Sequence, residues 1–396
     1  MSTLKVDNIR HNSATSDAIT MSSVGTCTAK LTSVGGGGLS HRNKIHNGSF
    51  IINQRGGPYT STGSENMMDR FSHGESAGIT FDTTTTVDSS GPDGFRKCLK
   101  ITPDSTQTPT GGQNAFIGHR IEGQDLQDLC FGTSSAKKIT ISFYAKSSSQ
   151  NNNHQYTLQI RKYDDSNNRN MVNRAFTVTS SWQRFIMTFD GDTAENIRND
   201  ISTGMQILWH LSTGPDDIHG ASTTFGRTVN NSLYSGVTGQ SNFMDNTNNE
   251  FYLTGVQLEV GDTATSFEHR SRRDELARCQ RYCVVIGADQ EMHLGTAHAY
   301  NSTNINLSMH LPVAIRLKPT ASVVLATSGG DANKWLQAYM GATGVKSNAS
   351  ISVSDCSEGH AQMRLYLQNA HSGLSVGQAL WCHTLPDAKL ILDAEL

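Results

Sequence analysis

The chain has 396 residues and a formal net charge of −3, from 32 Lys and Arg against 35 Asp and Glu. This length suits two or three domains of roughly 100–200 residues each. The near balance of charge argues against a nucleic-acid-binding protein, whose domains usually carry a basic excess or patch. Charged residues make up only 17% of the chain, below the typical ~25%, while Gly, Ser, Thr and Asn are plentiful. Such a composition favours many short strands joined by turns.

Cysteine usage and hydropathy exclude two further classes of protein. The seven cysteines lie far apart except for Cys279 and Cys283, and no His or Cys of zinc-site spacing accompanies that pair. We therefore expect free, buried thiols rather than a disulfide framework, and neither a metal nor another cofactor. The chain has no apolar run of ~18 residues and no signal peptide. We expect synthesis in a cytoplasm and no membrane insertion.

Residues 1–42 differ in composition from the rest of the chain. Two short apolar clusters are separated by polar turn formers, and four consecutive glycines at 35–38 follow them. One interpretation is a disordered tail. The other is an extended arm that docks on another protein by strand addition. In that case the docking residues are Leu4, Val6, Ile9, Ile19 and Met21.

From residue 43 to 268 the pattern is all-β. Short runs of alternating apolar and polar residues are bounded by clusters of Asn, Ser, Asp and Gly, and they predict at least eight strands. This number suits a two-sheet antiparallel sandwich of the jelly-roll type. The polar insertion at 214–249 predicts a loop on the rim. The predicted strands span residues 50–52, 95–102, 138–146, 155–163, 175–179, 182–189, 205–211 and 251–260.

Residues 251–283 connect this sandwich to the remainder of the chain. The first ten alternate with period two, which predicts a half-buried strand with Phe251 and Leu253 on the face opposite Val256. Residues 274–282 predict a helix, and Leu276, Cys279 and Cys283 form one apolar stripe on it at i, i+3 and i+7. Such a stripe is too small to support a domain. We expect 269–283 to be a connecting helix whose stripe contacts other copies of the chain.

Residues 284–396 predict a second β-sandwich. Trp335 and Tyr339 fall in a turn-bounded segment, and exposed rings with polar neighbours suit a bound sugar. Packing in the core is the competing interpretation for both rings. The predicted strands span residues 283–286, 304–311, 321–326, 351–353, 363–367, 379–383 and 390–392.

No catalytic motif is found. The chain lacks a Gly-x-Ser-x-Gly elbow, a phosphate-binding glycine loop ending in Lys-Ser/Thr, and a His-Glu-x-x-His pair. The carboxylate pairs 164–165 and 216–217 are typical of turns, because adjacent strand residues point in opposite directions. We therefore expect a protein that is not an enzyme. Calcium binding near Asp245, Glu250 or Asp262 stays open.

Several motifs together resemble the tail-fibre and virion proteins of phages that infect marine bacteria. The most specific is Leu253-Thr254-Gly255-Val256-Gln257-Leu258-Glu259-Val260-Gly261 with Ala264-Thr265, Phe267-Glu268, Arg270, Glu275-Leu276 and Cys279-Gln280-Arg281-Tyr282. Four earlier motifs occur in the same order, at 47–50, 53–56, 68–71 and 142–146, and the opening at 4–9 and 18–20 is similar as well. The chain departs from the pattern at Phe71, where relatives usually carry Trp. After residue 283 only 311–313 and 318–320 are similar.

This resemblance implies a jelly-roll like that of carbohydrate-binding modules, assembly as a homotrimer, and a distal domain that contacts the host surface. The expected protein is a tail fibre found in the virion. It would dock on other virion proteins by residues 1–42 and bind host glycan or protein by residues 284–396. A head decoration or head fibre is the alternative, and a glycan depolymerase is a second one. The tail or head position, the receptor, the symmetry and the host species stay open.

Overall fold

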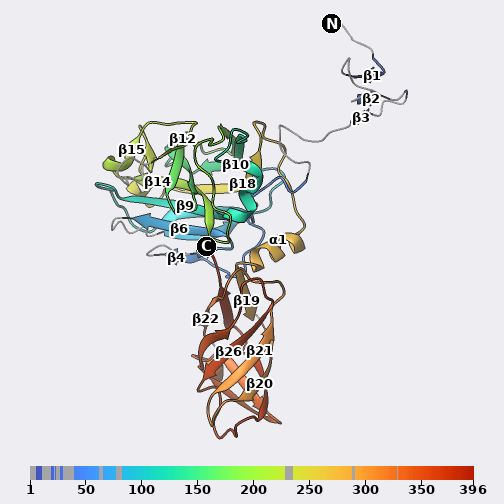
Figure 1. Cartoon of the computed structure of the whole chain (residues 1–396). Helices are drawn as coiled ribbons and strands as arrows, with labels where there is room; N and C mark the ends of the chain where they lie inside the picture. The colour runs from blue at the N-terminus through green and yellow to red at the C-terminus, as the bar shows by residue number, and fades with distance from the viewer. Residues whose placement is uncertain are drawn as a thin grey trace.

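The computed structural model describes residues 6–10, 19–21, 23, 27–29, 40–61, 66–76, 83–227, 235–287, 290–327 and 329–396. Figure 1 shows a jelly-roll sandwich, a second sandwich below it, and one short helix, α1, at the boundary between them. Their hydrophobic cores are separate: the first draws its residues from Ile45 to Val260 and the second from Val284 to Ala394. The fold is therefore all-β, as the sequence predicts.

The jelly-roll consists of two antiparallel sheets. The six-stranded sheet has the order β13-β10-β18-β8-β7-β4, and the seven-stranded sheet has the order β16-β12-β11-β14-β9-β6-β5. Their strands are β4 (Tyr59–Ser61), β5 (Asn66–Met68), β6 (Phe71–Ser76), β7 (Thr83–Asp88), β8 (Cys98–Pro103), β9 (Asn114–Glu122), β10 (Ile139–Ser147), β11 (Gln155–Tyr163), β12 (Arg169–Thr177), β13 (Gln183–Phe189), β14 (Thr203–Thr213), β16 (Gly226–Arg227) and β18 (Phe251–Val260).

Aromatic rings from both sheets meet in the core of the jelly-roll. Phe143 of β10 lies 5.7 Å from Trp209 of β14 and 5.2 Å from Phe176 of β12, measured between ring centroids. Phe71 is fully buried and packs against Phe50 at 4.6 Å. A core position accommodates Phe as well as Trp, because either ring removes a large apolar area from water.

The C-terminal sandwich has a three-stranded sheet, β19-β28-β22, and a seven-stranded sheet, β24-β23-β27-β20-β21-β26-β25. Its strands are β19 (Cys283–Gly287), β20 (His293–Ala299), β21 (Ile305–His310), β22 (Thr320–Val324), β23 (Leu336–Met340), β24 (Thr343–Ser347), β25 (Ser350–Asp355), β26 (Gln362–Gln368), β27 (Ala379–Thr384) and β28 (Lys389–Asp393). The helices are α1 (Arg272–Gln280) and the short 3₁₀ turns η1 (Gly123–Leu129), η2 (Pro215–Asp217), η4 (Phe243–Asp245) and η5 (Gly329–Asp331).

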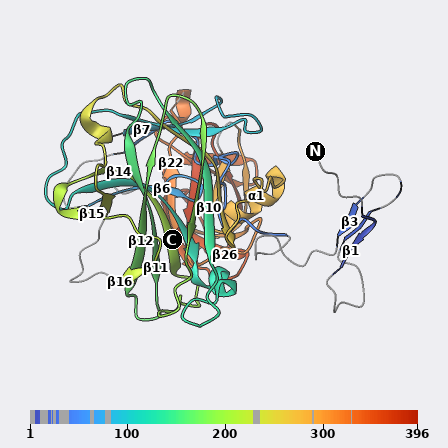
Figure 2. The same cartoon turned by 90° about the horizontal axis from the view of Figure 1, so that it is seen from above.

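A separate small sheet lies in the N-terminal segment. Its strands β1 (Asn8–Ile9), β2 (Ile19–Met21) and β3 (Cys27–Ala29) pair only with one another among the described strands. Both views place this sheet apart from the two sandwiches (Figures 1 and 2). Among the described residues, no helix has both the length and the apolar character needed to cross a membrane.

Strand β18 is buried at all ten positions rather than on one face, which corrects the prediction of a half-buried strand. Gly255 has φ +62°, and the register between β18 and β10 shifts beside it. This bulge inserts an extra residue, so the core-facing phase changes from Phe251 and Leu253 to Val256 and Leu258. The two apolar faces read from the sequence thus become one continuous core face.

The insertion at 214–249 is more than a rim loop. It carries η2, η4 and a parallel pair formed by β15 (Ile218–His219) and β17 (Gly236–Val237). Its Val237 N–H donates to Thr157 Oγ1 at 3.0 Å, and its Gln240 amide donates to the carbonyl of His210 at 3.2 Å. The described part of the insertion therefore packs over β11 and β14 on the face of that sheet opposite the core, whereas Phe243 and Met244 of η4 belong to the core itself.

Candidate functional site

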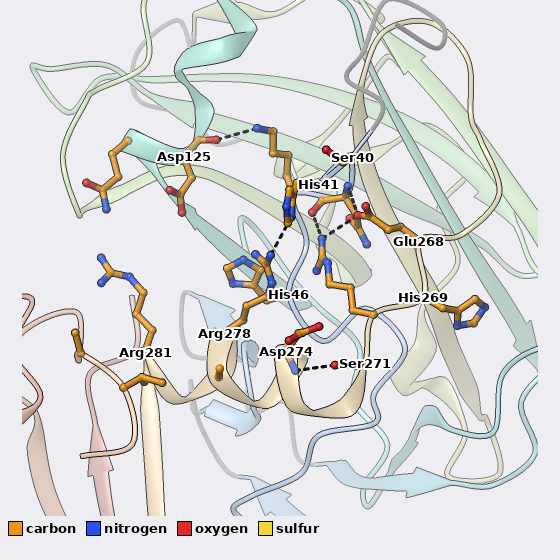
Figure 3. Close-up of a pocket in the computed structure, with 17 residues that line it drawn as sticks. Ser40, His41, His46, Asp125, Glu268, His269, Ser271, Asp274, Arg278 and Arg281 are labelled. Atoms are coloured by element: carbon orange, nitrogen blue, oxygen red, sulfur yellow. Dashed lines mark hydrogen bonds and ion pairs between the residues drawn. The ribbon is translucent and has the colours of Figure 1, made fainter. Parts of the chain in front are cut away.

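A polar pocket of about 1100 Å³ lies where the jelly-roll, helix α1 and the C-terminal sandwich meet (Figure 3). Residues 40–46 form one wall, the turn η1 contributes a second, and the segment leading into α1 forms a third. The lining includes several cationic side chains, but each has partners within the chain. Lys44 pairs with Asp128 at 2.9 Å, and Arg278 lies 3.3 Å from a ring nitrogen of His41.

Arg270 ties the entry of α1 to the start of the jelly-roll. Its guanidinium donates to the carbonyl oxygens of Asn43 and Ile45 and pairs with Glu268 at 3.2 Å. Glu268 in turn accepts the backbone N–H of Asn43 at 3.0 Å. Because the basic groups already hold the backbone, this pocket is better explained as a structural junction than as a reaction centre.

Helix α1 begins at a capped end. Ser271 accepts the backbone N–H of Asp274 at 3.1 Å, and Asp274 and Glu275 place negative charge in the first turn. Glu275 is buried and accepts the backbone N–H of Asn47 at 2.5 Å. The helix thus fixes the first turn of the jelly-roll as well as the domain boundary.

Two of the three stripe residues predicted for this helix do not face another copy of the chain, and one of them, Cys283, is the first residue of β19 because α1 ends at Gln280. Cys279 and Cys283 are both 0% exposed within a single chain, and burial raises the pKa of both thiols. This corrects the expectation that the two cysteines form an oligomer contact. Leu276 keeps part of its surface, so its role as such a contact stays a prediction. The six cysteines with described side chains are free thiols; four are buried as predicted, whereas Cys130 and Cys356 are partly exposed.

Below the pocket, a buried ionic cluster, which we call the joint, connects the two sandwiches. Arg70 pairs with Glu395, and the side chains are only 2% and 5% exposed. The guanidinium of Arg70 also lies 3.4 Å from the ring centroid of Tyr282. Arg316 donates to the carbonyls of Ala394 at 2.8 Å and Glu395 at 2.9 Å. Burial opposes the charge of Arg70, yet the carboxylate of Glu395 raises the pKa of Arg70.

A second ion pair crosses the same boundary. Arg281 donates to both carboxylate oxygens of Glu122 at 2.8 Å each, in the bidentate geometry that guanidinium favours. Glu122 is fully buried, which opposes its charge, but the bonds from Arg281 hold its pKa below the ordinary value. Gln54 adds a hydrogen bond to the carbonyl of Cys283 at 2.9 Å.

The residues of the sequence motif at 253–282 mostly build this boundary. Gln257 accepts the N–H of Glu268 at 2.7 Å, and Glu259 accepts the N–H of Thr265 at 3.1 Å. Together with Arg270 and Arg281, these contacts hold the link between β18 and α1 in a defined path. The motif is therefore explained by architecture rather than by chemistry on a substrate.

The two predicted sugar-contacting rings differ in position. Trp335 is 0% exposed, and its indole N–H donates to the carbonyl of Ala349 at 2.7 Å, so it is a core residue and its assignment to ligand binding is wrong. Tyr339 lies on β23 and is half-buried. It packs beside Trp381 of β27 at 5.1 Å and His383 at 5.6 Å.

Trp381 is the ring that sequence reasoning missed. It is 45% exposed, and residues 379–383 were expected to form a strand. Within that strand Leu380 and Cys382 are buried, so Trp381 and His383 belong to the other face. The alternation of the sequence carries this signal, because period two separates the faces of a strand.

Four predicted docking residues of the N-terminal segment are described. Val6, Ile9 and Met21 are 36%, 49% and 36% exposed, and Ile19 is partly exposed. Leu4 lies outside the described residues. Three of these four side chains are therefore exposed to solvent, and the fourth, Ile19, is partly exposed.

The expected turns and metal sites can also be compared with the structure. Asp164 accepts the N–H groups of Ser166 at 2.9 Å and Asn168 at 2.8 Å, and Asp216 and Asp217 belong to η2, so both carboxylate pairs lie in turns. Over the described ranges, no group of three or more His, Cys, Asp or Glu side chains is placed to hold a metal ion. Near the acidic positions considered for calcium, Glu250 pairs instead with Lys100 at 2.7 Å.

No protein-family model and no curated protein matches the chain. Among solved structures, it is similar to the enzymatically active domain of tailspike protein 4 from bacteriophage CBA120, with 12% identity, TM-score 0.29, and coverage of 55% of this chain and 21% of that one. The chain thus spans about a fifth of the tailspike's length. It is also similar to a xylan-binding domain of carbohydrate-binding family 22, with 9% identity, TM-score 0.30, and coverage of 57% of this chain and 99% of that one. A third match is the family 11 carbohydrate-binding module of the Clostridium thermocellum cellulase Lic26A-Cel5E, with 13% identity, TM-score 0.28, and coverage of 55% and 99%. At these TM-scores the assignment of the jelly-roll rests on the strand order of the chain itself.

Proposed function

We propose that this chain is a structural, non-enzymatic phage protein, a tail fibre that docks on the virion by its N-terminal segment and contacts host-surface glycan with its C-terminal sandwich. The observation that carries this proposal is that the two ends of the chain expose different kinds of surface. The exposed apolar side chains of Val6, Ile9 and Met21 precede the jelly-roll, and an exposed tryptophan lies on the sandwich at the other end. The sequence motif at 253–282, which resembles phage fibre proteins, builds the boundary between them.

The docking half of the proposal rests on the small N-terminal sheet. Exposed apolar side chains on a three-stranded sheet gain free energy when a partner removes them from water, at about 25 cal/mol per Å². The edge strands β1 and β3 also have open sides among the described strands, where a partner strand can pair. Strand addition satisfies both the apolar surface and the backbone groups.

Deletion of residues 1–42 tests this half of the proposal. We expect the truncated protein to stay folded, because the core of the jelly-roll begins at Ile45, and to be missing from purified virions. The matched variant Ile9→Asp should reduce incorporation without changing the circular dichroism spectrum. Normal incorporation of the deletion protein would refute docking by this segment.

Position and activity are tested on the full chain. Gold-labelled antibody on intact virions should mark the tail; label on the capsid would instead identify a head fibre.

Purified protein is also incubated with host capsule or lipopolysaccharide. Gel electrophoresis should then show that the length of the polysaccharide is unchanged. Shortening of the polysaccharide would overturn the non-enzymatic assignment.

A further inference from the structure

The outer face of the large sheet in the C-terminal sandwich carries an aromatic cluster, which consists of His293, Tyr339, Trp381 and His383. The strand register brings these residues together from three strands: Tyr339 lies opposite Trp381, and His293 lies opposite His383. A bulge between His293 and Gly295 shifts the register of β20 at this point, and bulges re-aim the side chains of the strand that carries them.

The tryptophan at the centre of the cluster is held in place by its neighbours. Its ring lies 5.1 Å from Tyr339 with an interplanar angle of 47°, and 5.4 Å from His383 at 80°. His383 in turn stacks on His293 at 5.1 Å and 17°. A ring that is 45% exposed yet braced on two sides presents a fixed apolar surface to the solvent.

The polar groups of the cluster have no partners in the described part of the chain. No hydrogen bond is made by the Trp381 indole N–H, the Tyr339 hydroxyl or the His293 ring, and Nε2 of His383 is buried without a partner. The buried indole N–H of Trp335, by contrast, bonds to the carbonyl of Ala349 at 2.7 Å. The cluster therefore combines an open apolar ring with several unused donors and acceptors.

The surroundings of the cluster are small and polar rather than apolar. Thr296 lies directly opposite Trp381, and Ser308 lies opposite Thr296 on the next strand; both are exposed. On the other side Gly344 faces Tyr339, and the nearby Lys346 is paired with Asp331 at 2.6 Å. A contact between protein copies favours an extended apolar centre, which these neighbours do not supply.

We propose that this cluster is a carbohydrate-binding site that stacks one pyranose ring on Trp381 and bonds its hydroxyl groups to Tyr339 and His293, while the His383 ring supports the tryptophan. A sugar ring has an apolar face of C–H groups and a rim of hydroxyls, and it matches the ring and the unpaired polar groups at once. This proposal rests on the proposed function, and it specifies which surface of the C-terminal sandwich binds the glycan.

The test uses the full-length protein and polysaccharide fragments extracted from the surface of the bacterium that the phage infects, with affinity measured by titration calorimetry. Trp381→Ala should weaken binding at least about tenfold. Trp381→Phe should lose less affinity, because it keeps an aromatic ring. Thr296→Arg, at an exposed position beside the ring, should also block binding. Trp182→Ala is the matched control on the jelly-roll and should keep the affinity of the unchanged protein.

Each other result would overturn the site in a distinguishable way. Full affinity in both Trp381→Ala and Thr296→Arg would place glycan binding elsewhere and leave the proposed function standing. Conversion of an oligomer to monomers by Thr296→Arg, seen by light scattering, would make this face a contact between copies. Binding to host cells that survives periodate oxidation but not protease would exclude a glycan. No binding of the unchanged protein to cells or fragments would remove the host-contact half of the proposed function as well.

Discussion

Gly255 controls which side chains of β18 reach the core. Its φ of +62° lies in the left-handed region, which glycine adopts without cost, and an added Cβ would lie 2.8 Å from the Phe95 ring and 2.9 Å from the Tyr144 ring. A larger residue there has to displace two rings, and most side chains also strain the backbone at this φ. Gly255 therefore allows the change of face in β18, and it also lies in close contact with two aromatic rings.

Gly255→Ala should lower the free energy of unfolding by about 2–4 kcal/mol, through backbone strain together with overpacking. Urea unfolding followed by tryptophan fluorescence measures this change. Gly94→Ala is a suitable control, because Gly94 has φ +88° with open space around it, so only the backbone cost applies. Equal losses in the two variants would show that the contacts with Phe95 and Tyr144 are unimportant.

The same residue shows what the sequence predicts and where that prediction stops. Period two located the strand at 251–260 with its observed bounds, because alternation is a local property. The change of face at Gly255 depends on the partner strand, and no local pattern contains it. The same holds for Trp335, which directly precedes β23, and for Trp381 on β27: only the packing of the folded sandwich decides which ring is covered.

At the scale of elements, the segment after β28 contacts residues that lie very far from it in the sequence. Glu395 accepts from the backbone N–H of Arg70 at 3.0 Å and pairs with its guanidinium, and Arg55 lies 4.0 Å away. Removing one partner of a buried ion pair leaves the other charge unpaired in a poorly solvated place, which costs about 3–5 kcal/mol.

Glu395→Gln should therefore destabilise the joint by about 3 kcal/mol and lower the temperature at which the two sandwiches separate in calorimetry. The exposed pair between Arg364 and Asp355, at 2.5 Å with side chains 46% and 67% exposed, gives the control. Asp355→Asn should change stability by less than about 0.5 kcal/mol, since water already solvates both charges. Comparable effects of the two substitutions would contradict the importance of the joint.

Elements were easier to predict than the contacts between them. The strands 155–163 and 251–260 coincide with the predicted ranges, whereas β7 was missed because its run of threonines shows no apolar alternation. Thr83 and Thr85 are nevertheless buried, since the sandwich covers them regardless of their polarity. Cys279 of α1 and Cys283 of β19 were assigned to the wrong surface for a related reason. A helical stripe shows that a face is covered, but not by which chain.

Buried histidines make the stability of the whole molecule depend on pH. Burial lowers the pKa of His73 to about 4, and burial with the charge of Arg70 lowers the pKa of His46 and His119 well below the ordinary value. In the unfolded chain these groups titrate near pH 6.5. The unfolded state therefore binds more protons as the pH falls below 6.5, and the stability that these histidines contribute above that pH is lost toward pH 4.

Urea unfolding at pH 7.5 and pH 4.5 measures this loss. The decrease in unfolding free energy should be smaller in His73→Gln than in the unchanged protein, by about 2–3 kcal/mol. His310→Gln, at an exposed position, should retain the full decrease. A pH dependence unaltered by His73→Gln would mean that this side chain titrates alike in the folded and unfolded states.

The joint also determines how a mechanical load would pass through the molecule. Strand β19 leaves the joint at Cys283, and β28 returns to it at Asp393, hydrogen-bonded to β19 along its length. A pull on the far end of the C-terminal sandwich puts both strands under tension in the same direction, so they share the force instead of peeling apart. Both strands end at buried arginines of the joint: Arg70 beside Tyr282 at the start of one, and Arg316 on the carbonyls that follow the other. The sandwiches would therefore resist separation as one clamped unit, and tension would reach the jelly-roll at two points rather than at a single hinge.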